Sequence, residues 1–222
     1  MYKTTWENIE DKNTSSYKRF GGIINMRKCI AFLLSLLLFL CGCSNKLKDE
    51  EIAKLLGTDK LPYGYYHASF VIDTSDLVEV TTYVDYVFVA KVTGYEKTEY
   101  DDESIRTYYK VVVEENIKGE LIKDQEIILV KSGGITEDNE SFSLCFDDIL
   151  PQIGEKYIFC AYVMEYIDEL YCFGPNTVCK VEQTDLMEDA SYLQYIEATK
   201  KTAEDIFEGK HIVSRYDVNY NE

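Results

Sequence analysis

A series of short segments rich in β-branched and aromatic residues, separated by turns that contain glycine, most constrains how this chain can fold. Val, Ile, Tyr and Phe favour strands because their side chains pack well on a half-buried pleated surface. The segments with this pattern cover residues 86–95, 105–117, 126–130, 142–146, 156–163, 170–174 and 177–181. Several short strands joined by such turns predict a small closed or partly closed barrel, which we place within residues 61–183.

Short helices are expected on the N-terminal side of the first strand. Residues 48–56 fit one or two helical turns closed by a glycine, and residues 75–84 fit a short helix that begins at a Thr-Ser-Asp sequence. Residues 61–66 combine aromatic side chains with Pro62 and Gly64. Because these two residues interrupt regular structure, we expect no regular element there.

The pattern changes to helical spacing near the C-terminus. A helix is predicted over residues 184–209, capped by Thr184 or Asp185 and stopped by Gly209, with a polar tail over 210–222. The fold class is therefore mainly β: an OB-like barrel of five to seven strands, with a short helix before it and a C-terminal helix.

The charge of the chain restricts its partners. The formal net charge is −17, and residues 1–42 carry six basic and three acidic groups, so residues 43–222 carry a net −20. A surface this acidic repels nucleic acid and anionic lipid headgroups, which argues against direct binding of either. Solubility is the simplest explanation of the acidity.

A short apolar segment near the N-terminus has the features of an export signal. Arg27 and Lys28 precede a largely apolar stretch of twelve residues, Cys29–Leu40. Twelve residues are too few for a stable membrane-spanning helix, but they fit the hydrophobic region of a signal peptide. Residues 26–42 are therefore predicted to be a signal peptide.

The end of this segment resembles the lipobox of bacterial lipoproteins. Leu40, Cys41, Gly42 and Cys43 match its order of an aliphatic residue, a small residue, Gly or Ala, and the modified Cys. The resemblance implies that signal peptidase cuts before Cys43 and that the Cys43 thiol carries a diacylglyceryl group. A cut before Cys41 would place the bulky Leu40 beside the bond. We thus expect a protein that is held by lipid on the outer face of the cell membrane, with residues 43–60 as its tether.

Residues 1–25 do not suit a signal peptide, which should begin near the N-terminus. Gly21-Gly22 can be encoded by GGAGGN, which resembles a ribosome-binding site, and the two glycines lie four codons before Met26. We therefore hypothesise that Met26 is the start and that residues 1–25 are either untranslated upstream sequence or disordered.

The region from about residue 77 to 182 resembles domains of lipoproteins on the surface of Gram-positive bacteria. It also resembles the netrin-like module of tissue metalloproteinase inhibitors, an OB-type barrel of five strands. The resemblance rests on the order of five phrases: Asp85-Tyr-Val-Phe-Val-Ala-Lys-Val-Thr-Gly, Tyr108-Tyr-Lys-Val-Val-Val-Glu-Glu-Asn-Ile-Lys-Gly, Gly133-Gly134, Gly154-Glu-Lys-Tyr-Ile-Phe and Phe173-Gly-Pro-Asn. In those inhibitors, an N-terminal Cys binds the zinc ion of the protease. Lipidation and a spacer separate Cys43 from the barrel, so the resemblance does not carry the inhibitor mechanism over.

No motif in the sequence specifies a reaction. Zinc-protease, serine-hydrolase, phosphate-loop and dinucleotide motifs are all missing, and His67 and His211 are the two histidines. Residues 101–103 and 147–148 are acidic, but they lack the spacing of a calcium loop and are interpreted as solvated loops. We expect no catalytic residue, no metal site and no cofactor apart from the lipid on Cys43.

Four cysteines lie in the predicted barrel: Cys145, Cys160, Cys172 and Cys179. An even number in an exported protein permits two disulfides, with three possible connectivities. Cys160 and Cys172 flank a predicted hairpin and are one candidate pair. The alternative is that some of the four are small buried apolar residues.

The function expected from the sequence is a non-enzymatic barrel that presents a binding or protective surface outside the cell. Tyr63, Tyr65 and Tyr66 form a candidate contact patch for a protein, a peptide or a glycan, although core packing explains them equally well. The alternative is an extracellular inhibitor or immunity factor that acts on a protease or toxin. A hydrolase that uses paired carboxylates is a third class, without specific support.

Overall fold

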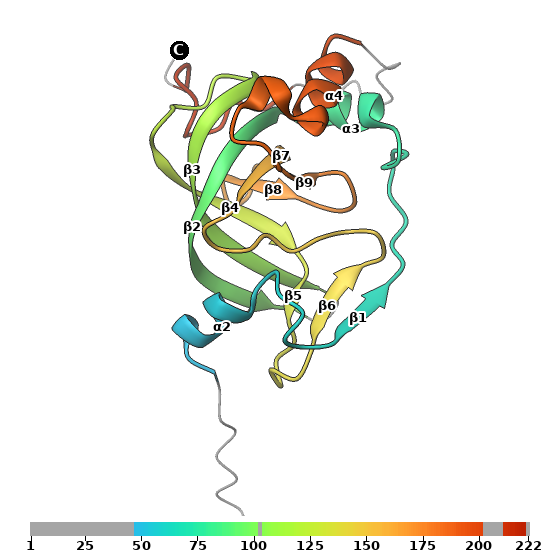
Figure 1. The fold of residues 1–222 in the computed structure, drawn as a ribbon, viewed down its shortest axis with the longest axis vertical. Coiled ribbons are helices and arrows are strands. Elements are labelled where there is room, and N and C mark those ends of the chain that lie inside the picture. Colours follow the sequence, from blue (N-terminus) through green and yellow to red (C-terminus); the bar gives the residue numbers. More distant parts are fainter. Residues whose placement is uncertain (1–46, 102–103, 202–210, 221–222) are drawn as a thin grey trace, which may run out of the picture. The chain divides into compact units, whose positions relative to one another are not determined.

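The computed structural model describes residues 47–101, 104–201 and 211–220, which are built mainly from β-strands (Figure 1). The predicted signal peptide and Cys43 lie outside these residues. No helix in the described ranges combines the length and the apolar character needed to cross a membrane.

The larger sheet has six strands, and five of them form a barrel-like ring. In the order β2-β3-β4-β8-β7-β9, its strands are Tyr86–Tyr100, Ile105–Lys118, Glu126–Ser132, Glu169–Cys172, Lys156–Met164 and Val178–Lys180. All neighbours are antiparallel except β4 and β8, and β2 also pairs with β7. The pairings thus return from β7 to β2, although short contacts of three residue pairs join β8 to β4 and β7. The ring is therefore partly closed, in agreement with the predicted OB-like fold class.

A smaller sheet in the order β1-β6-β5 lies beside the barrel (Figure 1). Its strands are β1 Tyr63–Tyr66, β6 Phe142–Cys145 and β5 Gly134–Ile135. The expectation that residues 61–66 form no regular element was therefore wrong. A strand distant in sequence supplies the hydrogen bonds of β1 in parallel pairing, while Pro62 stands just outside β1. This tertiary pairing outweighs the local effect of proline and glycine.

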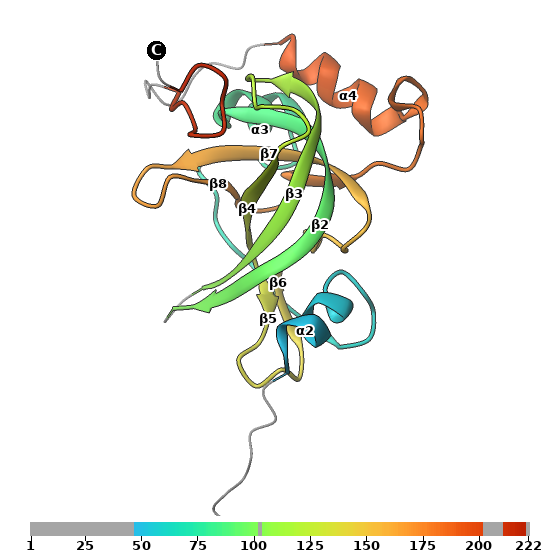
Figure 2. The ribbon, with the colours of Figure 1, turned by 90° about the vertical axis from the view of Figure 1, so that its left-hand side faces the viewer.

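Strand β2 is buried on both of its faces. Phe88, Ala90 and Val92 face the interior of the barrel, whereas Val87 and Val89 belong to a second core cluster. Side chains alternate between faces along a strand, so a continuous buried run requires cover on both sides. Helices α3 (Leu77–Tyr83) and α4 (Ala190–Thr199) supply this cover on the outer face (Figure 2).

The two helices before β2 pack on different sides of the barrel wall. Helix α2 (Asp49–Leu55) contributes Ile52 to the interior cluster and contacts β2. Helix α3 (Leu77–Tyr83) begins where the Asp76 side chain accepts a hydrogen bond from Val78 N at 2.8 Å. Both short helices lie where the sequence predicted them.

The phrase Lys118-Gly119 joins α3 to the barrel. The Lys118 ammonium donates to the carbonyl oxygens of Thr81 and Val84 at 2.8 and 2.5 Å, at the C-terminal end of α3. Gly119 has a φ of +78°, and a Cβ there would lie 2.3 Å from the Tyr86 ring. The phrase therefore marks a helix cap and a turn that requires glycine.

The C-terminal helix differs from its prediction. Two elements replace one: a 3-10 turn, Leu186–Glu188, capped by Asp185, and α4, Ala190–Thr199, capped by Asp189. Each aspartate accepts from backbone N–H groups, so each starts its own element. The predicted stop at Gly209 lies outside the described residues.

Residues 211–220 are docked on the barrel, although a polar tail was expected there. The Tyr86 hydroxyl accepts from Ser214 N at 2.9 Å, and Ile122 N donates to the Tyr216 carbonyl at 3.0 Å. Ile212 and Tyr216 also pack against the interior cluster. This segment is therefore part of the folded domain.

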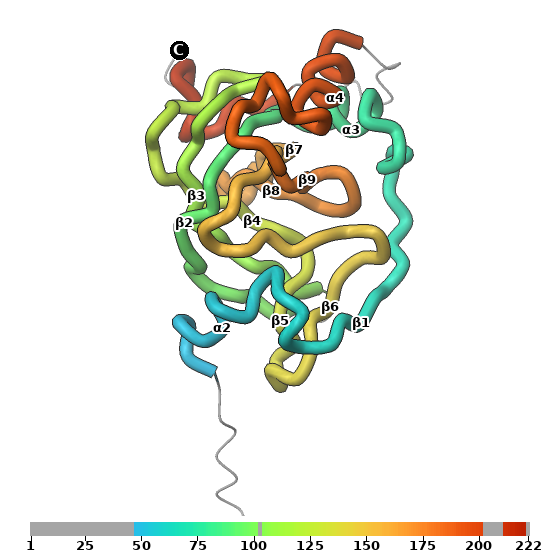
Figure 3. The backbone as a smooth tube through the Cα atoms, in the orientation of Figure 1, coloured from blue at the N-terminus to red at the C-terminus, as the bar shows by residue number. Residues whose placement is uncertain are grey.

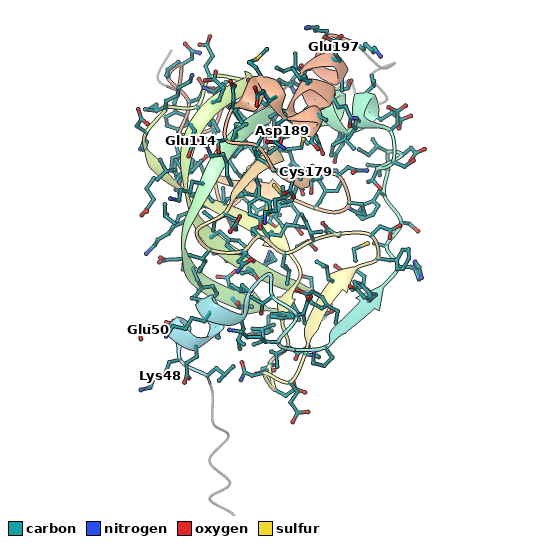
Figure 4. All side chains as sticks on the ribbon, in the orientation of Figure 1. Lys48, Glu50, Glu114, Cys179, Asp189 and Glu197 are labelled. Atoms are coloured by element: carbon teal, nitrogen blue, oxygen red, sulfur yellow. The ribbon has the colours of Figure 1, made fainter. Side chains whose placement is uncertain are left out.

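Asp189 is the residue that fixes α4 (Figure 4). Its carboxylate accepts from Tyr192 N, Glu182 N and Gln183 N at 2.9, 2.8 and 3.1 Å. Burial acts to raise the pKa of Asp189, but the backbone donors outweigh it and the pKa lies below its ordinary value. The ionised carboxylate thus stabilises the fold.

We predict that Asp189→Asn destabilises the protein by about 1–2 kcal/mol at neutral pH, because an amide oxygen cannot accept all three bonds. A depressed folded-state pKa gives a contribution that is present above the unfolded pKa of about 4 and is lost as the pH falls through the folded value. The stability gap between wild type and variant should therefore shrink below about pH 4 in urea unfolding. Asp185→Asn, at the exposed cap of the 3-10 turn, is the control, and an equal loss there would contradict the assignment.

Candidate functional site

An exposed aromatic face lies over β1 and the start of the loop that follows β6. Tyr65 and Phe146 are 56% and 49% exposed, and their rings meet edge to face with centroids 6.1 Å apart. The ring of His67 lies 5.3 Å from that of Phe146. Tyr65, His67 and Phe146 are called the aromatic face below. Large exposed rings that contact one another are typical of binding surfaces.

The three tyrosines of the predicted contact patch play different parts. Tyr65 and Tyr66 are exposed, whereas Tyr63 is half-buried and packs on Phe142 with ring centroids 5.0 Å apart. Burial raises the pKa of Tyr63 to about 12, and its hydroxyl donates to the Thr58 carbonyl at 3.3 Å. The half-buried Tyr63 ring therefore packs β1 onto β6, and the Tyr65 ring stacks on it with centroids 5.8 Å apart.

A cavity of about 330 Å³ adjoins the aromatic face. Three loops build it: the segment after β1, the turn after β6 and the Phe173-Gly-Pro-Asn phrase between β8 and β9. Its lining includes His67, Phe70, Cys145, Phe146, Asp147 and Asn176. Two of these six, His67 and Phe146, are shared with the aromatic face, so the cavity and the face form one continuous site.

The Phe173-Gly-Pro-Asn phrase holds the rear wall of this cavity. The Asn176 side-chain amide donates to the Thr74 carbonyl at 2.7 Å, and the Tyr195 hydroxyl donates to the Asn176 carbonyl at the same distance. A Cβ on Gly174 would lie 2.5 Å from the Phe70 ring, so only glycine allows this close approach. The phrase is therefore a connector between the cavity, the loop before α3 and α4.

A buried ion pair fixes the loop that carries Phe146. Lys131 of β4 is fully buried, and its ammonium pairs with the carboxylate of Asp148, which is also buried. The second oxygen of Asp148 accepts from Ile149 N at 2.8 Å, and the Lys131 ammonium donates to the Ser132 carbonyl at 3.2 Å. The pair joins β4 of the barrel to the start of the chain between β6 and β7, which crosses over the loop after α2 (Figure 3).

The sequence analysis missed Lys131. A charged residue within the apolar strand Glu126–Ser132 was the available signal, since a lysine at a buried strand position needs a carboxylate partner. Asp148 was grouped with Asp147 as part of a solvated acidic loop. The structure separates the two, because Asp148 is buried against Lys131 while Asp147 is exposed.

The cavity brings a thiol and an imidazole into one lining, but it does not connect them. Cys145 and His67 share the cavity, and no hydrogen bond joins them in the described part of the chain. A cysteine nucleophile needs a base within hydrogen-bond reach. Within the same residues, no group of three His, Cys, Asp or Glu side chains is placed to hold a metal ion.

His211 and three of the four cysteines lie outside this cavity. His211 Nδ1 lies 3.2 Å from a carboxylate oxygen of Asp85, at the start of the docked C-terminal segment. Cys145, Cys160, Cys172 and Cys179 are free thiols. The β7–β8 register pairs Tyr162 with Tyr171, so Cys160 and Cys172 do not stand opposite each other across the hairpin. Burial raises the pKa of Cys172 to about 12, which keeps this thiol protonated.

No protein-family description matches the chain, and no curated protein matches its sequence.

We predict that Lys131→Met destabilises the protein by about 3–5 kcal/mol, because it leaves the Asp148 carboxylate buried without a partner. The double variant Lys131→Met with Asp148→Leu should recover most of this loss, since no buried charge remains. Urea unfolding of both variants measures the difference. Lys123→Met removes an exposed pair with Glu115 and should cost about 1 kcal/mol or less. A similar small loss for Lys131→Met would contradict the role of the pair.

Proposed function

We propose that this protein is a bacterial lipoprotein, cut before Cys43 and held by diacylglyceryl lipid on the outer face of the cell membrane. The support is the order of a basic pair, a largely apolar stretch of twelve residues and the sequence Leu40-Cys41-Gly42-Cys43. The chain between Cys43 and Asp49, where α2 begins, spans at most about 20 Å even when it is extended. Such a tether keeps the domain beside the membrane.

We further propose that the anchored domain is a non-enzymatic binding module. The observation that carries this proposal is the aromatic face, whose exposed rings continue into the lined cavity. Tyr65 and Phe146 present large contact area with few rotatable bonds, which limits the entropy lost on binding. The buried Lys131–Asp148 pair beneath the site holds it in one geometry.

The anchor is tested by the intact mass of the protein extracted from membranes. The expected mass is that of residues 43–222 plus acyl chains, and the variant Cys43→Ala should lose the lipid and the membrane association. Thiol alkylation after unfolding, with and without reduction, counts the free cysteines in the same sample. A mass that retains residues 26–42 without lipid would overturn the lipoprotein proposal.

The binding role is tested by photocrosslinking on intact cells. We expect p-benzoylphenylalanine at position 65 to capture a partner, whereas the same group at Tyr220, which is 47% exposed, should not. Equal labelling from both positions, or none from position 65, would contradict the proposal. A protease or toxin as the captured partner would instead favour an inhibitor or immunity factor, and capture of an envelope protein or glycan would favour the binding module.

A further inference from the structure

We infer that the outer edge of β1 binds an extended basic peptide segment as an added strand, with one Lys or Arg side chain entering the cavity beside Asp147. The inference rests on the proposed binding function and names the chemistry of its partner. Three observations carry it: the direction of the free backbone groups of β1, the exposure of this edge, and the unpaired carboxylate in the adjoining cavity.

The hydrogen bonds of β1 show which of its backbone groups are free. Phe142 N donates to the Pro62 carbonyl at 2.8 Å, and Phe146 N donates to the Tyr66 carbonyl at 2.9 Å. In a parallel ladder alternate residues bond to the same neighbour, so the groups of Tyr63 and Tyr65 point away from β6. Strand β1 ends its sheet, and no hydrogen bond reaches those groups within the described residues.

Strand β1 is four residues long and follows Pro62, but within it and in the segment after it the edge has no further device against strand addition. Tyr65, Tyr66 and His67 are exposed, and the β1–β6 register runs without a bulge. Proteins commonly blunt an exposed edge with lysine, proline or a bulge. From Tyr63 to Phe70 the sequence contains neither lysine nor proline. Strand β1 therefore presents a short open edge that fits the backbone of a peptide in extended form.

The cavity lies just beyond the C-terminal ends of β1 and β6, where a side chain of the added strand can enter it. Asp147 lines this cavity with an exposed carboxylate, which has no ion-pair or hydrogen-bond partner among the described residues. The rings of Phe146 and His67, with centroids 5.3 Å apart, line the same cavity. A carboxylate next to aromatic rings suits a Lys or Arg side chain, which gains an ion pair and a cation–π contact.

The charge of the whole domain favours a basic partner. Residues 43–222 carry a net −20, which attracts cationic segments and repels acidic ones. General attraction of this kind has no register. Strand addition does fix a register, because only every second amide of the peptide faces β1. This difference makes the inference testable.

The test uses the lipidated full-length protein in detergent micelles and the fluorescein-labelled peptide acetyl-(Val-Lys)₄-amide, followed by fluorescence anisotropy. Two further peptides carry N-methyl groups on all Val amides or on all Lys amides. N-methylation removes strand donors and keeps every charge. We expect one methylated peptide to bind about as well as the parent and the other to bind at least roughly tenfold more weakly.

A matched pair of variants tests the cavity. Asp147→Asn should weaken binding of the parent peptide roughly five- to tenfold. Asp124→Asn is the control, since Asp124 is also an exposed aspartate with positive φ, +60° against +62°, and lies in the turn between β3 and β4. The change in net charge is the same in both variants, so the control should alter binding less than roughly twofold.

Equal binding of both methylated peptides, equal effects of the two variants, or no binding of the parent peptide would overturn the inference. These outcomes differ from a failure of the proposed function, which crosslinking at position 65 measures on cells. Partner capture at position 65 without peptide binding would leave the binding module in place and remove the basic strand as its ligand.

Discussion

Strand β2 is the element on which the rest of the structure depends, because it is paired along both edges and covered on both faces. Its first half bonds to β7 on one side and to β3 on the other, so it closes the barrel-like ring. Its inward residues build the interior, and its outward residues receive α3 and α4. Packing on both faces leaves one register for the strand, since a slip by one residue would exchange the two sets.

The site is attached to this framework by a different kind of interaction. Leu150 and Ile153 anchor the far part of the loop that carries Phe146 and Asp147 on the interior cluster, whereas Phe146 and Ile149 at its start are exposed. The start of the loop is fixed by the buried pair of Lys131 and Asp148. A buried pair contributes little net stability, but its directional bonds can specify one arrangement. The barrel thus supplies stability, and the ion pair positions the site.

The fold was largely predictable because most of its strands have a local composition that favours β-structure. The segments from Tyr86 and Ile105 are long, β-branched and aromatic, and both became strands, the first extending to Tyr100 instead of ending at residue 95. Strand β1 could not be predicted in the same way, since its pairing with Phe142–Cys145 depends on residues about 80 positions away. The division of the predicted C-terminal helix into a 3-10 turn and α4 could not be predicted either. Asp189 starts α4, and its carboxylate is held by backbone donors at Glu182 and Gln183.

The site was only partly predictable for the same reason. Tyr65 and Tyr66 were singled out by composition, but Phe146 and Asp147 enter through tertiary contacts that leave no local pattern. Lys131 had a local signal, a charge within an apolar strand, but its partner Asp148 did not. His67 was noted among aromatic residues, and its contact with Phe146 explains that setting. Local sequence therefore indicates which side chains are available, whereas the fold decides which of them meet.

The acidity of the domain and the open edge of β1 are connected. An exposed edge strand is a hazard, because two copies can pair through it and aggregate. A net charge of −20 on residues 43–222 makes each copy repel the next, and membrane anchoring at high local density would make this repulsion more important. The same charge favours approach by a basic segment. If β1 binds a basic strand as inferred above, the acidity would both limit pairing between copies at this edge and favour a partner of opposite charge.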